Sequence, residues 1–233
     1  MCGRATLTKN ESELEEKFGA TFYSEDIERY NPIPSYNIGP AQPLVYIAQN
    51  DQSHLKIGIW GWNIPMGVKT QLVINARLEE IDQKKTFIPY LDYGKCIILI
   101  DGYYEWMRLH NEKIPFRITS PDDSILAIAG LFREEINKDG NSVNNVIVMT
   151  KPVQDSLQQI HDRMPVILTE SEQQNWLNNK IERKIIKNLV NIERITNLQA
   201  YRVSSKVNSI KNNNADLILP NETPIYFQEN LFD

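Results

Sequence analysis

Cys2 directly follows the initiator methionine, so removal of Met1 leaves an N-terminal cysteine that carries an α-amine and a thiol on neighbouring carbon atoms. The thiol has an ordinary pKa of about 8.5 and the α-amine one of about 7.7 to 8.0, so both groups are reactive near neutral pH. With an aldehyde, the amine forms a Schiff base and the thiolate closes on the same carbon to give a five-membered thiazolidine. The other suitable electrophile is an acyl group. A cysteine at position 2 usually has no function of its own, so the residues around it in the fold must show whether Cys2 is reactive.

Asn75 lies where a predicted buried strand at 72–74 ends, in the run Asn75-Ala76-Arg77 followed by Glu79. An amide in such a place can hold an amine or a carbonyl in position. The alternative is an asparagine that turns the chain and an arginine in a surface ion pair. The pattern alone does not choose between them.

Glu105 lies among aromatic residues in the run Asp101-Gly102-Tyr103-Tyr104-Glu105-Trp106, directly after an apolar stretch. Loss of water in such a place favours the protonated carboxyl, which suits a general acid. The alternative is a glutamate on the solvent face of a strand whose neighbours face the core.

His161 closes a predicted helix, where the helix dipole favours the charged imidazole, and Arg163 lies beside it. The alternative is a histidine that only caps the helix. His54 and His110 have no comparable setting.

The hydrophobic pattern predicts a scaffold rich in strands. Asn10 and Glu13 form a capping box for a short N-terminal helix. Apolar runs of strand length lie at 55–59, 72–74, 96–100, 125–128 and 146–149, with weaker ones at 115–118 and 201–203. Further helices are predicted to start at Pro152, to start at Thr169 and to cover 181–189. Prolines make the segment 31–43 irregular, with an extended edge at 36–38. Asp101-Gly102 is predicted as a turn. We expect an α+β fold with residues 1–233 as a single domain.

The composition sets limits on the function. The 233 residues are 41% hydrophobic, enough for one substantial core. A net charge of −5 does not support bulk electrostatic coating of nucleic acid, although a local basic groove is compatible with it. Two cysteines, Cys2 and Cys96, are too few for a disulfide scaffold or a zinc site, and there is no signal peptide or membrane span. We expect a cytoplasmic protein without a metal or nucleotide cofactor.

Several runs recur in one order along the chain: Met1-Cys2-Gly3-Arg4, Tyr36-Asn37-Ile38-Gly39-Pro40, Trp60-Gly61 with Ile64-Pro65, Asn75-Ala76-Arg77, the run 101–106, Ala129-Gly130-Leu131, the run 160–168, Val203-Ser204 and Val207-Asn208. Together they resemble the SOS response-associated peptidase (SRAP) family, the abasic-site processing proteins, over nearly the whole chain. The resemblance implies a sheet-rich, barrel-like antiparallel core flanked by helices. It also implies a positively charged channel at whose centre Cys2, Asn75, Glu105 and His161 converge.

The same resemblance implies roles for these residues. Cys2 forms the thiazolidine, Asn75 orients its amine, Glu105 moves protons during opening of the sugar ring and reversal of the linkage, and His161 is a second acid or base. Arg4, Arg77 and Arg163 bind the flanking phosphates, and Trp62 and Met66 wedge or stack against neighbouring bases. The chain departs from the family at Met66-Gly67-Val68, because a Trp usually follows the Ile-Pro pair there; Lys69 offers a positive charge in compensation.

We therefore expect a monomer that crosslinks to abasic sites in single-stranded DNA and shields them, in the cytoplasm and on the nucleoid at damage. Two alternatives stay open. The same four residues can form an autoproteolytic or cysteine peptidase centre. Alternatively, the sheet and its aromatic residues bind single strands without covalent chemistry, and Cys2 is incidental.

Overall fold

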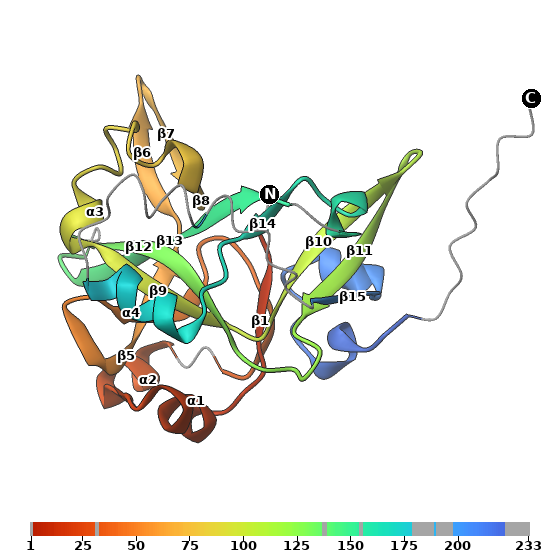
Figure 1. The fold of residues 1–233 in the computed structure, drawn as a ribbon, viewed down its shortest axis with the longest axis horizontal. Coiled ribbons are helices and arrows are strands. Elements are labelled where there is room, and N and C mark those ends of the chain that lie inside the picture. The colour runs from red at the N-terminus through yellow and green to blue at the C-terminus, as the bar shows by residue number, and fades with distance from the viewer. Residues whose placement is uncertain are drawn as a thin grey trace, which may run out of the picture.

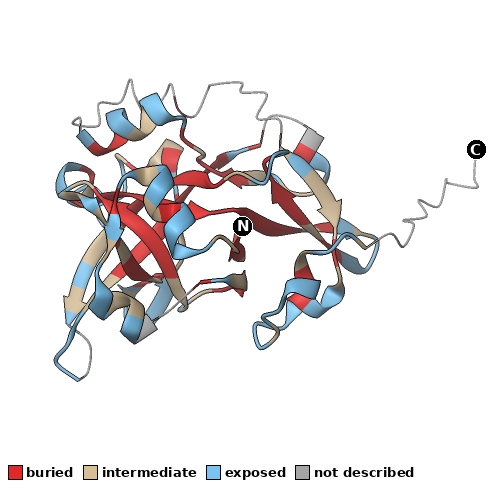
Figure 2. Ribbon diagram, turned by 90° about the horizontal axis from the view of Figure 1, so that it is seen from below, coloured by how far each residue is buried: buried red, intermediate tan, exposed pale blue. Residues whose placement is uncertain are grey.

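The computed structural model describes residues 2–30, 33–136, 139–153, 156–178, 189 and 198–221. Two sheets, built mainly from antiparallel strands, form the body, and short helices lie around them (Figure 1). Buried residues concentrate on the strands, whereas the helices expose one side (Figure 2). The prediction of a strand-rich α+β fold is confirmed. In the part of the chain that the structure describes, no helix is long and apolar enough to cross a membrane.

The first sheet joins the N-terminal segment to the chain around Glu105. Its strands lie in the order β15 (Gln199–Arg202), β11 (Glu112–Thr119), β10 (Gly102–Leu109), β1 (Ala5–Leu7) and β3 (Ser35–Ile38). All neighbours are antiparallel, and β3 forms an edge, as predicted for 36–38. Ala5 lies opposite Tyr103, so the residues before β1 run beside the residues that follow Tyr103.

The second sheet closes on itself. Its strands lie in the order β14 (Arg163–Pro165), β13 (Ser142–Pro152), β12 (Leu126–Ile136), β9 (Lys95–Ile100), β4 (Pro43–Ala48), β5 (Asp51–Trp60) and β2 (Thr21–Phe22). β13 also pairs in parallel with β5, at Val146 opposite Trp60. Strands β13, β12, β9, β4 and β5 therefore form a closed ring, which confirms the barrel-like core. A short strand, β8 (Asn75–Arg77), pairs in parallel with the later part of β13.

A two-stranded hairpin, β6 (Trp62–Met66) and β7 (Lys69–Val73), projects from this barrel (Figure 1). The strand predicted at 72–74 is wrong in extent and in burial, because the mostly exposed β7 ends at Val73 and β8 begins separately at Asn75. The apolar run has another cause. Leu72 and Ile74 pack over Gly61, where even an added Cβ atom would meet both side chains.

The helices are short and begin at local capping signals. In α1 (Glu11–Phe18), Asn10 and Glu13 form the predicted capping box. α4 (Glu170–Asn178) follows Thr169, whose amide and hydroxyl both donate to the Glu172 carboxylate. The other helices are α2 (Ser24–Tyr30), α3 (Tyr90–Tyr93) and the 3-10 turns η1 (Leu78–Glu80), η2 (Ser156–Gln159), η3 (Ser205–Asn208) and η4 (Ala215–Ile218). The helix predicted at 181–189 lies, apart from Leu189, outside the described residues.

The helix predicted to begin at Pro152 is wrong. Pro152 is the last residue of β13, opposite Arg163, and among the described residues η2 is the one helical turn before His161. Proline lacks an amide hydrogen, so the end of a strand suits it as well as the start of a helix. His161 thus follows one short turn, and no long helix dipole acts on it. Asp101-Gly102 is also not a hairpin turn, because the chain passes there from β9 in the second sheet to β10 in the first.

Candidate active site where the two sheets meet

Cys2 and Glu105 are brought together by the pairing of β1 with β10. Cys2 lies three residues before β1, in the stretch that runs beside the residues after Tyr103. Its thiol is hydrogen-bonded to the Glu105 carboxyl. Only 2% of each residue is exposed. A nucleophile and an acid are therefore in direct contact, away from bulk water.

Glu105 is buried because both faces of β10 are covered at this point. Tyr104 points into a small second cluster with Val203 and Val207, on the opposite face of the strand. The alternative interpretation, a glutamate on the solvent face of its strand, is wrong, since this part of β10 has no solvent face.

Asn75 holds the backbone of Cys2. Its Nδ2 donates to the Cys2 carbonyl oxygen at 2.8 Å. The strand that carries it, β8, is fixed by the parallel pairing of Asn75 with Val148 on β13. Its Oδ1 is buried and has no hydrogen-bond partner within the described ranges. A buried acceptor therefore faces the N-terminal segment with capacity for one more donor.

His161 completes the cluster from the other side of β13, which pairs with β14 just after His161. The imidazole Nε2 lies 3.8 Å from Glu105 Oε2. Its Nδ1 accepts from the Arg163 amide at 3.0 Å, and an Asp162 carboxylate oxygen lies at the same distance. Nδ1 also lies 3.3 Å from the Arg163 carbonyl oxygen, so it accepts from the Arg163 amide when its proton is on Nε2 and donates to the carboxylate or carbonyl when it carries the proton itself.

Burial sets the protonation of the central pair. It raises the pKa of the Glu105 carboxyl above its ordinary value, which agrees with the first of the two interpretations that the sequence left open. The pKa of the Cys2 thiol is raised well above its ordinary value, first by burial and then by the neighbouring Glu105. The thiol is thus held neutral until a base takes its proton, and Glu105 is the base in contact with it.

The three arginines predicted to bind phosphates differ in their freedom. Arg77 is well exposed and forms a surface ion pair with Glu80 at 3.0 Å. The structure therefore shows the surface ion pair that the sequence left open as the alternative for Arg77. An exposed pair of this kind is weak, so Arg77 can exchange the Glu80 carboxylate for another anion.

Arg4 and Arg163 use their guanidinium groups inside the protein. Arg4 donates to one side-chain oxygen and two backbone carbonyls, those of Asn37, Val207 and Asn208. Arg163 holds Glu79 through two bonds of 2.6 and 3.1 Å and also donates to Thr150. These contacts anchor the segments beside Cys2 and His161 and leave fewer donors for a phosphate.

Trp62 cannot stack on DNA, so that prediction is wrong. Its side chain is fully buried, its Nε1 donates to the Asn145 carbonyl at 3.0 Å, and the Arg133 guanidinium lies 4.7 Å from its ring centre. The alternation along β6 places it against the barrel. Met66, in contrast, is 59% exposed at the tip of the hairpin, and Val68 beside it is fully exposed.

A pocket of about 400 Å³ opens beside the cluster. Glu105 and His161 line it together with four residues that were not predicted as site residues: Trp106, Arg108, Lys113 and Asn208. The sequence holds one sign of this pocket, because Arg108 and Lys113 lie at equal distances from the short β10–β11 connection. They are seen to face each other only once β10 and β11 are known to pair as a hairpin.

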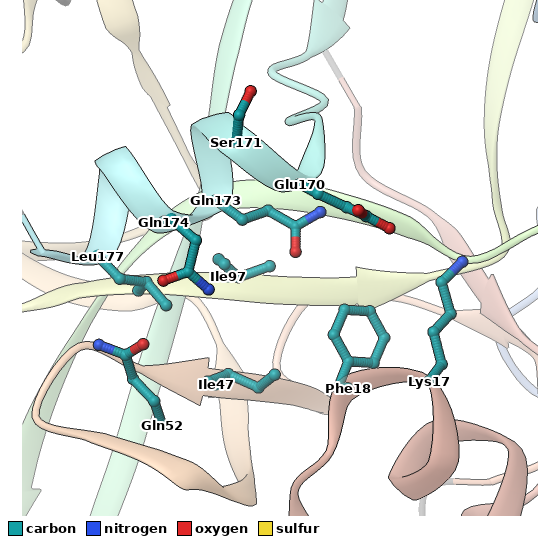
Figure 3. Close-up of a pocket in the computed structure, with 10 residues that line it drawn as sticks. All are labelled: Lys17, Phe18, Ile47, Gln52, Ile97, Glu170, Ser171, Gln173, Gln174 and Leu177. Atoms are coloured by element: carbon teal, nitrogen blue, oxygen red, sulfur yellow. The ribbon is translucent and has the colours of Figure 1, made fainter.

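A larger cavity, of about 530 Å³, lies elsewhere, between α1 and α4 (Figure 3). Ile47, Ile97 and Phe18 form its apolar side, and glutamines surround it. Two of these amides already donate within the protein, Gln52 to Asn178 and Gln173 to the Leu168 carbonyl. None of the four clustered residues lines it, so it is separate from the candidate active site.

Comparison with known proteins identifies the family. The family model for SOS response associated peptidase (SRAP) matches residues 1–210. The abasic site processing protein YoqW of Bacillus subtilis (strain 168) is 36% identical over 225 residues, covering 94% of this chain and 99% of that protein. The abasic site processing protein YedK of Escherichia coli (strain K12) is 29% identical over 228 residues, covering 94% and 100%.

A solved structure shows the same fold. The crystal structure of a protein from Bacteroides thetaiotaomicron matches with a TM-score of 0.80 at 22% identity, covering 94% of this chain and 100% of that one. With the family model and the relatives, it leads to one conclusion: this chain belongs to the SOS response associated peptidase family of abasic site processing proteins.

Proposed function

We propose that this protein captures abasic sites in single-stranded DNA covalently, through the amine and thiol of Cys2 after removal of Met1. The observation that carries the proposal is the buried cluster in which Cys2 contacts Glu105 and Asn75, with His161 beside them. The names of the relatives, abasic site processing proteins, support the choice of lesion.

The chemistry follows from the two nucleophiles of Cys2. An abasic deoxyribose in its open form ends in an aldehyde carbon. The amine adds to this carbon, and the resulting carbinolamine loses water to give an iminium ion. The sulfur then adds to the same carbon as the thiol proton leaves, closing a neutral thiazolidine. One C–N and one C–S bond replace the C=O bond, water is released, and no oxidant or reductant is needed.

Glu105 is placed to move protons in these steps. As an acid it protonates the departing hydroxyl of the carbinolamine, a role favoured by its raised pKa. As a carboxylate it then accepts the thiol proton across the hydrogen bond that it shares with Cys2. His161 is partly exposed and lies next to Glu105, so it connects this buried carboxyl with solvent.

Asn75 holds the nucleophile in place. Its Nδ2 fixes the Cys2 carbonyl, and we assign its buried Oδ1 to the Cys2 amine, a donor that matches it. An amine held in this way presents its lone pair to an aldehyde in one direction only.

The DNA contacts are assigned by exposure. Arg77 exchanges Glu80 for a backbone phosphate, and Met66 contacts a base from the tip of the β6–β7 hairpin. Arg4 and Arg163 take part through the donors that their internal contacts leave unused.

The test is an incubation of purified protein with a single-stranded oligonucleotide that holds one abasic site, followed by a denaturing gel. Wild type and Cys96→Ala, which removes the other buried thiol, should give a shifted band; Cys2→Ala and Cys2→Ser should give none that survives heating. Mass spectrometry first confirms that Cys2 is the N-terminal residue. A heat-stable Cys2→Ser band, or no band with wild type, contradicts the proposal.

A second activity of the same centre is self-processing, which the contact between Cys2 and Glu105 favours. After Glu105 takes its proton, the Cys2 sulfur attacks the preceding carbonyl, the amide nitrogen leaves as the free amine, and water hydrolyses the thioester. Mass spectrometry of a chain with added N-terminal residues should show their loss in wild type and their retention in Cys2→Ala. Equal loss in both would assign the processing to another enzyme.

A further inference from the structure

We propose that Arg108 and Lys113 form a second backbone-phosphate subsite, which holds the single strand on the β10–β11 hairpin as it leaves the reacting sugar. The inference rests on the proposed function, because it extends the same site along the DNA.

The hairpin places the two cations side by side. Arg108 on β10 lies directly opposite Lys113 on β11, and residues opposite each other in an antiparallel pair have neighbouring side chains. Both are exposed. Two like charges at such a position repel each other, so the arrangement gains from an anion placed between them.

Neither cation is neutralised by a residue that the structure describes. Within the described ranges, Arg108 and Lys113 form no ion pair and no side-chain hydrogen bond. The nearest carboxylate in sequence, Glu112, points to the opposite side of β11 from Lys113 by strand alternation. In this respect the pair differs from Arg4 and Arg163, whose guanidinium groups are engaged inside the protein.

The pocket joins this pair to the reacting groups. Glu105 and His161 line the same cavity of about 400 Å³ as Arg108 and Lys113. Trp106 lines the pocket too, and its indole Nε1 donates to Asn208 Oδ1 at 2.7 Å, which fixes the ring in the pocket wall. An aromatic ring with a pair of cations two residues further along the hairpin suits a nucleotide, with its sugar or base on the indole and its phosphate on the cations.

A phosphodiester explains this layout better than a free carboxylate. A sugar that reacts at Cys2 is part of a continuous strand, so a phosphate must leave the site on each side. Arg77 lies two residues from Asn75 on β8 and is exposed, whereas Arg108 and Lys113 line the pocket that Glu105 and His161 also line. The two proposed subsites therefore reach the reacting cluster from different strands.

The experiment separates binding from chemistry. Binding of an oligonucleotide with a tetrahydrofuran abasic analogue, which has no aldehyde, is followed by fluorescence anisotropy at several salt concentrations. Arg108→Ala and Lys113→Ala should each weaken binding about 3- to 10-fold at low salt and reduce the slope of log K against log salt by about 0.7, the value for one phosphate on a single strand. Arg108→Lys keeps the charge and should stay within about twofold of wild type.

Lys9→Ala is the matched control. It also removes one lysine charge, but beside α1, at the opposite end of the molecule from the hairpin tip (Figure 1). It should leave both affinity and salt slope as in wild type. Thermal unfolding should be the same for all four variants, because these side chains are on the surface.

The outcomes separate this inference from the proposed function. With an aldehyde-bearing site at saturating DNA, Arg108→Ala and Lys113→Ala should crosslink at the wild-type rate. Loss of affinity in these variants supports the subsite even if wild type forms no crosslink, and in that case only the proposed chemistry fails. Wild-type affinity and salt slope in both alanine variants, or a reduced saturating rate with unchanged affinity, overturns the subsite.

Discussion

At the scale of single residues, the buried pair of Cys2 and Glu105 differs from the usual activated cysteine. Many reactive cysteines have a lowered pKa, next to a cation or at a helix N-terminus. Here burial and the neighbouring carboxyl raise the pKa of the Cys2 thiol, and burial raises the pKa of Glu105. A resting thiolate is therefore disfavoured. This ordering suits a reaction in which the amine attacks first and the thiol closes the ring after Glu105 has given up its proton.

The raised pKa of Glu105 predicts how stability depends on pH. The folded protein binds this proton more tightly than the unfolded chain, so the corresponding stability is present below the unfolded pKa of about 4.3 and is lost as pH rises through the folded pKa. Glu105→Gln cannot ionise and escapes this loss. The melting temperature of the variant relative to wild type should therefore rise between pH 4 and pH 8, as measured by thermal unfolding.

Glu80→Gln is the control of opposite sign. Hydrogen bonds from Arg77 and then Lys84 lower the pKa of Glu80, so its contribution is present above the unfolded pKa and is lost as pH falls. This variant should be at its weakest, relative to wild type, at neutral pH. A Glu105→Gln curve that runs parallel to wild type would show that the folded pKa is not raised.

Asn75→Ala should affect both rate and stability. It removes the donor to the buried Cys2 carbonyl, which costs about 1 to 3 kcal/mol when an acceptor is left unpaired. It also frees the amine, so the crosslinking rate should fall about 10- to 100-fold, equivalent to about 1.4 to 2.7 kcal/mol of activation free energy. Single-turnover gels and urea unfolding measure the two effects. Asn50→Ala, at an exposed turn, should change neither; an unchanged rate in Asn75→Ala would remove its assigned role.

At the scale of elements, β13 and the β1–β10 pair assemble the site. β13 has β8 on one side and β14 on the other, which brings Asn75 and His161 to the same place from 86 positions apart in the chain. The β1–β10 register adds Cys2 and Glu105. These pairings are short: β1, β8 and β14 have three residues each, and this length is enough to position the four side chains.

This assembly also separates what the sequence can predict from what it cannot. The capping box at Asn10 depends on near neighbours and was predicted, whereas the burial of Glu105 was one of two interpretations, because the residues that cover its strand lie far along the chain. The parallel pairing of β8 with β13 and the closure of the barrel depend on partners far along the chain, which hydrophobic periodicity does not contain. Trp62 was misplaced for the same reason, because only the tertiary fold reveals Asn145 and Arg133 around it. The convergence of the four site residues came from resemblance to a family.

Asp101 is predicted to hold β1 in register with β10. Its carboxylate accepts hydrogen bonds from Thr6 and Thr8 on one side and from the buried Arg117 on the other. Asp101→Asn breaks this buried ion pair and should lower the free energy of unfolding by about 3 to 5 kcal/mol. Asp123→Asn is the control, since Asp123 lies 3.9 Å from the same Arg117 but is exposed. Urea unfolding that shows equal losses in both variants would contradict the special role of Asp101.

At the scale of the whole molecule, the net charge of −5 means that DNA is not held by the surface as a whole. In the proposed function, binding comes from local features: the exposed Arg77, the hairpin cations and the tip of the β6–β7 hairpin. That hairpin projects from the barrel (Figure 1), and Met66 near its tip is exposed. An unbranched thioether packs against many shapes but stacks on a base less strongly than an indole does.

Met66→Trp should therefore strengthen binding of single-stranded DNA. One added base–aromatic stack is worth about 1 to 3 kcal/mol, so affinity for the tetrahydrofuran oligonucleotide should rise by about 5-fold or more at constant salt slope, because no charge changes. Leu219→Trp is the matched control: Leu219 is 58% exposed, close to the 59% of Met66, but follows η4 at the other end of the molecule (Figure 1). It should bind as wild type does. Equal gains in both variants would mean that an exposed indole attracts DNA anywhere on this surface, and no gain in Met66→Trp would place the bound strand away from the hairpin tip.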